Sequence, residues 1–343
     1  MKPLIKVIDF DNDASLLEQF LALPRTLHSG DPNWLPDPGE ARWLTAVAKR
    51  KFLAMAGDQV CGRAAVMVNP NLRDERDHPY GQIGFFECVQ DLSAAASLIN
   101  VALAWLRSNT QDTETILAPM NFDTWHAYRL RTRGFDEPTF LMEPHNPSYY
   151  PAQFSALGFT PISHYLTKTV DDLSSLPDGW QPFYRDAIGR GYTFRSFDPS
   201  CIREEMSLIH RLSLDIFREN LFFVDISEDE FRSLYAGVAG ELDPDLLIFI
   251  LDPNREPIGF SFSIPDHRQP GTANLKTMGV LPHENGKGVG AALAYEAYHR
   301  LEVKGFERVN HCLMRAGNRA DQFDRDQAKI TREYTLYARP LQP

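Results

Sequence analysis

The segment of this chain best suited to chemistry is the run Asn-Gly-Lys-Gly-Val-Gly at residues 285–290. It follows residues with strand character and precedes a stretch in which Val289, Leu293 and Ala297 recur at helical spacing. Glycines let a bound group come close to the backbone, and the first amide groups of a helix favour anions. The segment therefore predicts a binding site for a pyrophosphate.

Two other phosphate-binding loops fail on spacing. A P-loop would need glycine at position 281 and serine or threonine at position 288, where this chain has Leu281 and Gly288. A dinucleotide fingerprint that starts at Gly288 would need glycine or alanine at position 293, where the chain has Leu293. The remaining alternative is an ordinary glycine-rich turn from strand to helix.

The elements around this loop repeat an order already present in the first half of the chain. In the first half, two strands flank a turn and are followed by a strand, a helix and a strand, at residues 51–56, 60–68, 82–87, 93–107 and 115–118. The second half repeats this order at residues 246–251, 258–264, 273–281, 289–304 and 309–314. We therefore predict an α/β protein with mixed sheets and two tandem domains, residues 1–172 and 192–343, joined by a linker at residues 173–191.

Residues 278–290 resemble the acyl-CoA signature of the GNAT superfamily, a strand followed by Gln/Arg-x-x-Gly-x-Gly/Ala and a helix. Gly288 and Gly290 match the two glycines, and Asn285 stands where the family usually has arginine or glutamine. The resemblance implies that the strand backbone pairs with the pantetheine arm of acyl-CoA and that the loop amides bind its pyrophosphate. The cofactor-binding residues it implies are Met278, Gly279, Val280, Asn285, Gly286, Lys287, Gly288, Val289, Gly290 and Asn318.

The first half shows a fainter resemblance. Residues 146–159 resemble the Asn to Leu-Gly-Phe motif that ends many GNAT domains, but residues 87–93, where the pyrophosphate loop belongs, contain no glycine. The chain thus resembles a tandem GNAT protein whose first copy is degenerate and does not bind CoA. Residues 84–87, 119–122 and 146–150 also resemble a bacterial branch of such proteins, some of which are thought to acylate long-chain amines, as in ceramide synthesis.

This resemblance implies an acyl-CoA-dependent N-acyltransferase. Transfer of an acyl group from a thioester to an amine needs a base for the amine proton, donors for the oxyanion and a proton for the CoA thiolate. The resemblance implies that the backbone near Val280 supplies the oxyanion donor. It also implies that a late tyrosine, Tyr334 or Tyr337, protonates the thiolate; the alternative is that both pack in a strand.

The residue that removes the amine proton is less defined by the sequence. The strand before the loop carries no carboxylate at residues 274–279, where many GNAT enzymes have a glutamate. His311 has a suitable intrinsic pKa, and Glu219 and Asp225 are the alternatives. A buried histidine with only a structural role is the other interpretation of His311.

Composition excludes several other classes of function. The formal charge of −11 disfavours nucleic-acid binding. The histidines and the four cysteines show no metal-binding spacing, so we expect no metal, and the absence of a G-x-S-x-G motif disfavours a serine hydrolase. No apolar run reaches the roughly 18 residues of a membrane span, and the N-terminus lacks signal-peptide features, so a cytoplasmic location is expected.

The sequence thus predicts a transferase that acts on a small-molecule or lipid amine, and the resemblance to the bacterial branch implies a long-chain one. The alternative is a non-catalytic acyl-CoA-binding or sensor protein, because no single base is evident. A third hypothesis, an aminoacyl transferase that uses charged tRNA, is disfavoured by the acidic charge and by the intact glycine loop.

Overall fold

The computed structural model describes residues 4–37, 39–175, 177–236, 242–318, 321 and 327–342 of the 343-residue chain. Its contacts divide the chain into two compact units, the first made of Met1–His164 and Glu333–Pro343 and the second of Tyr165–Arg332. The division falls inside strands β7 (Thr160–Val170) and β13 (Ala328–Pro340). The chain therefore passes between the units within two strands rather than through a linker.

The predicted domain boundaries differ from this division because of strand pairing. β13, at the end of the chain, pairs with β5 (Thr115–Ala118) and β6 (Leu130–Arg133) of the first unit. Tyr337 lies opposite Ala118, and Thr335 lies opposite Leu130. The last residues thus join the sheet of the first unit, although they follow the second unit in the chain.

The first unit is a mixed sheet covered by helices. Its strands follow the order β1 (Ile5–Phe10), β2 (Arg50–Ala56), β3 (Gln59–Arg73), β4 (Pro79–Cys88), β5 and β13, and β6 also pairs with β13. Its helices are α1 (Ala14–Leu27), α2 (Glu40–Val47), α3 (Leu92–Asn109) and α4 (Tyr150–Ala156). Because side chains alternate along a strand, Phe52 and Ala54 of β2 join the core beneath α3, whereas Leu53 joins the core that contains Phe20 of α1.

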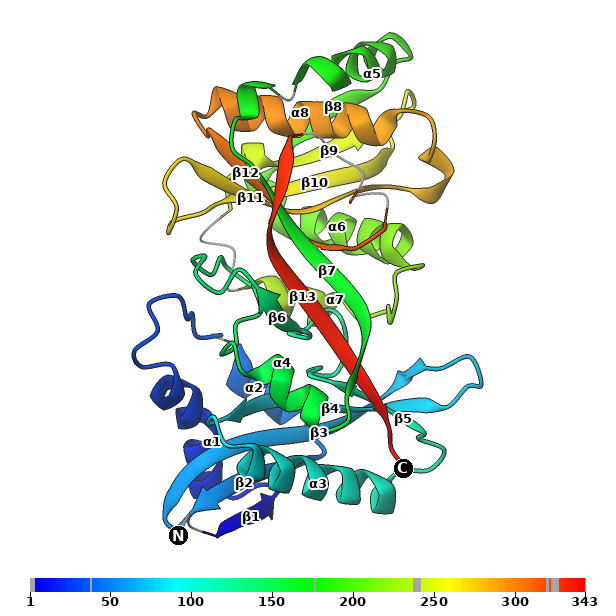
Figure 1. The fold of residues 1–343 in the computed structure, drawn as a ribbon. Coiled ribbons are helices and arrows are strands. Elements are labelled where there is room, and N and C mark those ends of the chain that lie inside the picture. Colours follow the sequence, from blue (N-terminus) through cyan, green and yellow to red (C-terminus); the bar gives the residue numbers. More distant parts are fainter. Residues whose placement is uncertain are drawn as a thin grey trace. The chain divides into compact units, whose positions relative to one another are not determined.

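The second unit repeats this construction. Its strands follow the order β7, β12 (Arg308–Arg315), β11 (Thr272–Val280), β10 (Pro257–Pro265), β9 (Leu247–Leu251) and β8 (Thr193–Ser196). Its helices are α5 (Pro177–Gly189), α6 (Ile202–Phe217), α7 (Glu228–Tyr235) and α8 (Val289–Val303). Figure 1 shows α8 on one side of these strands and α6 on the other. On the α8 side, Ile248 and Ile250 of β9 pack in the same cluster as Val289 and Leu293.

Both units contain the predicted order of hairpin, strand, helix and strand. In the first unit these elements are β2, β3, β4, α3 and β5, and in the second they are β9, β10, β11, α8 and β12. The predicted mixed α/β fold with a repeated order of elements is confirmed.

The segment predicted as a linker contains helix α5, which packs on α8. The ring of Trp180 lies 5.0 Å from that of Tyr298, and the ring of Tyr184 lies 4.8 Å from that of Tyr295. Proline and glycine near the start of this segment suggested a turn, but its aromatic residues at positions 180 and 184 form one apolar helix face. Burial of that face against α8 explains why the segment is helical.

Candidate functional site

The glycine loop lies between β11 and the N-terminus of α8, as predicted. Gly286 and Gly288 have φ angles of +81° and +78°, a backbone region that glycine adopts without steric cost. The first hydrogen bond of α8 runs from the amide of Ala292 to the carbonyl of Gly288, at 3.0 Å. The amides of Val289, Gly290 and Ala291 precede this bond and have no partner within the helix, so they can bind an anion at the positive end of the helix dipole.

Side chains outside the glycine motif hold the loop in place. The buried carboxylate of Glu284 accepts a hydrogen bond from the Tyr192 hydroxyl at 2.9 Å and one from Lys287 Nζ at 3.0 Å. Arg190 Nη2 donates to the carbonyl of Lys287 at 3.1 Å. Sequence reasoning missed Glu284, Tyr192 and Arg190 because Tyr192 and Arg190 lie more than 90 positions before the loop.

The loop glycines differ in how much space surrounds them. A Cβ added to Gly288 would lie 2.9 Å from Cδ1 of Phe183, a half-exposed residue of α5. A Cβ added to Gly290 would meet none of the described atoms within 4 Å. Glycine at position 288 is therefore required by the local backbone and by α5, whereas position 290 has room for a side chain.

The end of β11 presents backbone groups that no described neighbouring strand uses. β11 pairs with β12 only over Thr272–Leu275. The amide of Leu281 donates to the carbonyl of Ile258 at 2.8 Å, toward β10. Because backbone groups alternate in direction along a strand, those of Met278 and Val280 point the opposite way, where no described ladder continues. This edge can accept an extended ligand.

The divergence of β12 from β11 has a local cause. The pairing of β12 with β7 shifts register between His311 and Met314, and Leu313 has a φ angle of +60°. Such a bulge bends a strand and ends regular pairing. β12 therefore leaves β11 where the predicted cofactor-binding residues begin.

The first unit fills the equivalent edge with its own chain. β4 pairs with β5 only at Gly81 and Gln82, but the segment after β5 then takes over. The amide of Met120 donates to the carbonyl of Ile83 at 3.0 Å, and the amide of Phe85 donates to Asn121 Oδ1 at 2.7 Å. In the first unit, the edge that corresponds to that of Met278 and Val280 is thus occupied.

The end of β4 is closed by two tyrosines. The Tyr150 hydroxyl accepts a hydrogen bond from the amide of Cys88 at 2.7 Å and donates to Glu87 Oε2 at 2.6 Å. The Tyr149 hydroxyl donates to the carbonyl of Cys88 at 2.8 Å. The helix that follows, α3, has Asp91 as its N-cap, and this carboxylate accepts a hydrogen bond from the amide of Ser93 at 2.8 Å. A negative side chain at this helix N-terminus opposes the binding of a pyrophosphate.

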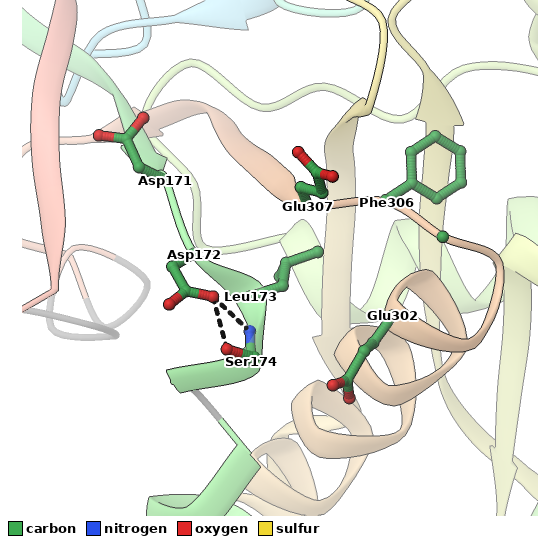
Figure 2. A pocket seen from close by; sticks show the side chains of 8 residues that line it. Asp171, Asp172, Leu173, Ser174, Glu302, Phe306 and Glu307 are labelled. Atoms are coloured by element: carbon green, nitrogen blue, oxygen red, sulfur yellow. Dashed lines mark hydrogen bonds between the residues drawn. The ribbon is translucent and has the colours of Figure 1, made fainter.

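An open pocket lies at the opposite end of α8 from the glycine loop (Figure 2). It is lined by Asp171, Asp172, Leu173, Ser174, Glu302, Gly305, Phe306 and Glu307. Asp172 accepts hydrogen bonds from the amide and the hydroxyl of Ser174, at 3.0 and 2.6 Å. The pocket combines four carboxylates with the negative end of the α8 dipole, so it is unsuited to a CoA phosphate.

The predicted acid candidates lie in the first unit, whereas the glycine loop lies in the second. Tyr334 is fully buried, and its hydroxyl donates to the carboxylate of Glu143. Tyr337 is buried in the main core, with its ring 5.9 Å from that of Phe154, and burial raises its pKa. These contacts give both tyrosines a structural role, and their catalytic role remains a prediction.

The predicted base His311 lies on β12 of the second unit. Its side chain is buried, and its Nε2 shares a hydrogen bond with the Tyr298 hydroxyl of α8. Burial and, to a smaller degree, the charge of Lys168 lower the pKa of His311 to about 4. The alternatives Glu219 and Asp225 are both exposed.

Asn318, the predicted pantetheine contact, lies beyond β12 in the second unit. Its side-chain oxygen accepts a hydrogen bond from the amide of Asp321 at 2.9 Å. Lys168 Nζ donates to the carbonyl of Asp321 at 2.6 Å, which ties Asp321 to β7. The structure thus brings residues 278–280 and 285–290 together at the N-terminus of α8, and it places Asn318 outside that loop.

Comparison with known protein families gives a match over the region that contains the glycine loop. Residues 209–323 match the family model described as "Acetyltransferase (GNAT) family". This chain contains a GNAT domain. The matched residues run from α6 past β12 and include the open strand edge, the glycine loop and α8. The predicted resemblance to the GNAT superfamily is therefore confirmed.

Two relatives and one solved structure extend the comparison. The chain is 26% identical over 269 residues to Protein YghO of Escherichia coli K12. The aligned region covers 73% of this chain and 66% of that protein. It is 23% identical over 311 residues to the bacterial ceramide synthase of Caulobacter vibrioides, and this aligned region covers 87% of this chain and 77% of that protein. The match thus spans just under two thirds of YghO.

The solved structure is a tandem GNAT protein from the clavulanic acid biosynthesis pathway, with a TM-score of 0.56 and 12% identity over 99% of each chain. Its fold supports the tandem arrangement of this GNAT chain. Within the described residues, no helix is both long enough and apolar enough to cross a membrane.

Proposed function

We propose that this GNAT protein is an N-acyltransferase that binds acyl-CoA in its second unit alone and transfers the acyl group to an amine. The observation that carries the proposal is the contrast between the two units at one place in the fold. In the second unit the edge at Met278 and Val280 and the amides at residues 289–291 are available to a ligand. In the first unit Tyr149, Tyr150 and Asp91 occupy the corresponding place.

The residues of the second unit would each have a defined task. The amides of Val289, Gly290 and Ala291 would bind the pyrophosphate, and the backbone of Met278 would pair with the pantetheine arm. The amide of Val280 would donate to the thioester oxygen and stabilise the oxyanion as the amine attacks. A carbon–nitrogen bond forms, the carbon–sulfur bond breaks, and the amine loses one proton while the thiolate gains one.

Proton transfer is the less constrained part of the proposal. His311, Glu219, Asp225 or a water molecule held by one of them would take the amine proton. A pKa of about 4 makes His311 a weak base at neutral pH, so it is not favoured over the exposed residues Glu219 and Asp225. Tyr334 or Tyr337 stays the predicted acid for the thiolate, although both are buried and belong to the first unit.

Direct attack by the amine is favoured over a covalent acyl-enzyme. Cys61, Cys88 and Cys312 are buried, and burial raises the pKa of Cys88 to about 12. A thiol with such a pKa stays protonated at neutral pH and is a poor nucleophile. Cys201 is exposed and lies in no activating motif that we recognise.

A long-chain amine is the acceptor class that we propose. The support is the relative that is named a ceramide synthase, at 23% identity over 87% of this chain.

The experiment is a transfer assay with purified full-length protein. Short-chain and long-chain acyl-CoAs are each combined with a panel of amines that includes sphingoid bases, and free thiol and acylated amine are both measured. The expected result is amide formation with sequential kinetics. A trapped acyl-enzyme with ping-pong kinetics would contradict direct attack, and CoA binding without transfer to any amine would favour the sensor alternative.

A further inference from the structure

The first unit contains a cluster of metal-ligating side chains beside the closed end of β4. His28 follows the end of α1, Asp31 lies in the next turn, and His145 lies in the segment before α4. One ligand atom from each of the three residues lies within 4.8 Å of those of the other two. The amide of Asp31 donates to the carbonyl of His28 at 2.9 Å, which holds these two residues in one turn.

The three side chains differ in exposure in a way that suits a metal ion. The side chains of His28 and His145 are 2% and 6% exposed, whereas that of Asp31 is 34% exposed. The two imidazoles therefore meet inside the protein, and the cluster opens to solvent at the carboxylate. Two histidines and one carboxylate with an accessible fourth position form a donor set used for zinc and related ions.

Neighbouring groups fix the orientation of both imidazole rings. The Thr139 hydroxyl lies 2.9 Å from Nδ1 of His145, so Nε2 of that ring faces Asp31, at 2.7 Å from Oδ2. The His28 ring stacks on Trp34, with ring centroids 5.3 Å apart. A hydrogen bond to the second ring nitrogen, as at His145, is typical of metal-binding histidines, because it orients the ring and selects its tautomer.

A further carboxylate lies beside the cluster. Oε2 of Glu87 is 3.2 Å from Nε2 of His28 and accepts a hydrogen bond from the Tyr150 hydroxyl at 2.6 Å. It is placed to accept a hydrogen bond from His28 or from a metal-bound water molecule. Glu87 thus lies beside the three proposed ligands as an outer carboxylate.

We propose that His28, Asp31 and His145 bind a divalent transition-metal ion, of which Zn²⁺ suits the donor set best. The ion would tie the end of α1 to the segment before α4 and so stabilise the first unit. Binding would replace the hydrogen bonds of His145 with Asp31 and of His28 with Glu87. The proposal departs from the sequence-based expectation of no metal, because Asp31 and His145 are 114 residues apart and form no short motif.

The test uses the full chain after treatment with a chelator and dialysis. Co²⁺ is titrated while visible absorption is recorded, and Zn²⁺ bound after equilibrium dialysis is measured by mass spectrometry. One equivalent is expected, with at least 10-fold weaker binding in Asp31→Asn and His145→Gln. Thr139→Val, which removes only the outer contact to His145, should weaken binding by about 10–100-fold.

The matched control is His78→Gln. His78 belongs to a second group of possible ligands in the first unit, with Asp74 and Glu114, and it is more exposed than His28 or His145. This variant should bind Co²⁺ as the wild type does. Absence of Co²⁺ and Zn²⁺ binding by the wild type, or unchanged binding in His145→Gln, would overturn the proposal.

A second measurement keeps the proposal testable if His145→Gln fails to fold. Zn²⁺ should raise the melting temperature of the wild type, because an ion that binds only the folded state stabilises it. It should not raise that of Asp31→Asn, whose substituted side chain is partly exposed and nearly isosteric. Equal shifts in both proteins would contradict the site.

Discussion

The hydroxyl of Tyr150 accepts a hydrogen bond from the backbone amide of Cys88, at 2.7 Å. Cys88 ends β4, the strand that corresponds to β11 in the second unit. In the first unit, the Tyr150 side chain thus accepts the hydrogen bond of the last amide of β4. The corresponding end of β11 in the second unit has no described partner on that side. The same order of elements therefore produces one closed and one open edge.

Replacing Tyr150 by phenylalanine should destabilise the first unit by about 1–3 kcal/mol, because the buried amide of Cys88 loses its acceptor and Glu87 loses a donor. Urea denaturation measures this loss. The control is Tyr149→Phe: Tyr149 is only partly buried, so water can replace its hydroxyl and the loss should be smaller. Equal stability of Tyr150→Phe and wild type would show that the closure contributes nothing.

Replacing Gly288 by valine should abolish CoA binding, measured by calorimetry. The fold holds residue 288 at a φ of +78°, which is strained for valine. The new side chain would also lie against Phe183 at the N-terminus of α8. Gly305→Val is the control, because Gly305 has a φ of +84° with no described atom within 4 Å of an added Cβ, and it lies at the other end of α8. CoA affinity that is equal in the two variants would contradict the loop assignment.

His311 should make the stability of the second unit depend on pH. Its pKa of about 4 in the folded state is below the roughly 6.5 of an unfolded histidine, so the unfolded state binds the proton more tightly. This contribution is fully present above pH 6.5 and decreases, by on the order of 3 kcal/mol, as the pH falls toward 4. Urea midpoints at several pH values should fall less in His311→Gln than in the wild type. Parallel curves for the two proteins would show that His311 does not titrate in this way.

Replacing the true general acid by phenylalanine should lower turnover, by about 100-fold or more, and leave CoA affinity unchanged. Tyr337→Phe is the cleaner variant, because the Tyr337 ring packs in an apolar core that phenylalanine would also fill. Tyr334→Phe also removes a donor from the buried carboxylate of Glu143, so its stability must be measured in parallel. Unchanged turnover in both variants would exclude both tyrosines from this role.

Much of the second unit could be predicted from the sequence because its signals are local. The apolar repeat that includes Val289, Leu293 and Ala297 predicts α8, and the helix runs over Val289–Val303. Glycine at positions 286 and 288 predicts a loop whose backbone a ligand can approach closely, and in the structure both residues have positive φ angles. Each of these features depends on residues within a few positions of one another, so spacing alone was sufficient.

Helix α5 shows where local signals were insufficient. Proline and glycine at residues 177–182 suggested a linker, and only packing of Trp180 and Tyr184 on α8 explains the helix. β13 gives the second example: its pairing with β5 assigns Tyr334 and Tyr337 to the first unit, against their place in the chain order. The helical state of α5 and the unit to which β13 belongs both depend on contacts between residues far apart in the sequence.

The pyrophosphate site and the metal site also differ in whether their residues are close in the sequence. The pyrophosphate site is a prediction from the sequence alone, because glycines and a helix N-terminus are adjacent in the chain. Three other contacts are visible only in the folded chain: Tyr192 bonds Glu284 beside the loop, Tyr150 bonds the amide of Cys88, and His145 meets Asp31. These pairs are 92, 62 and 114 residues apart, so their meeting depends on strand pairing and core packing rather than on local spacing.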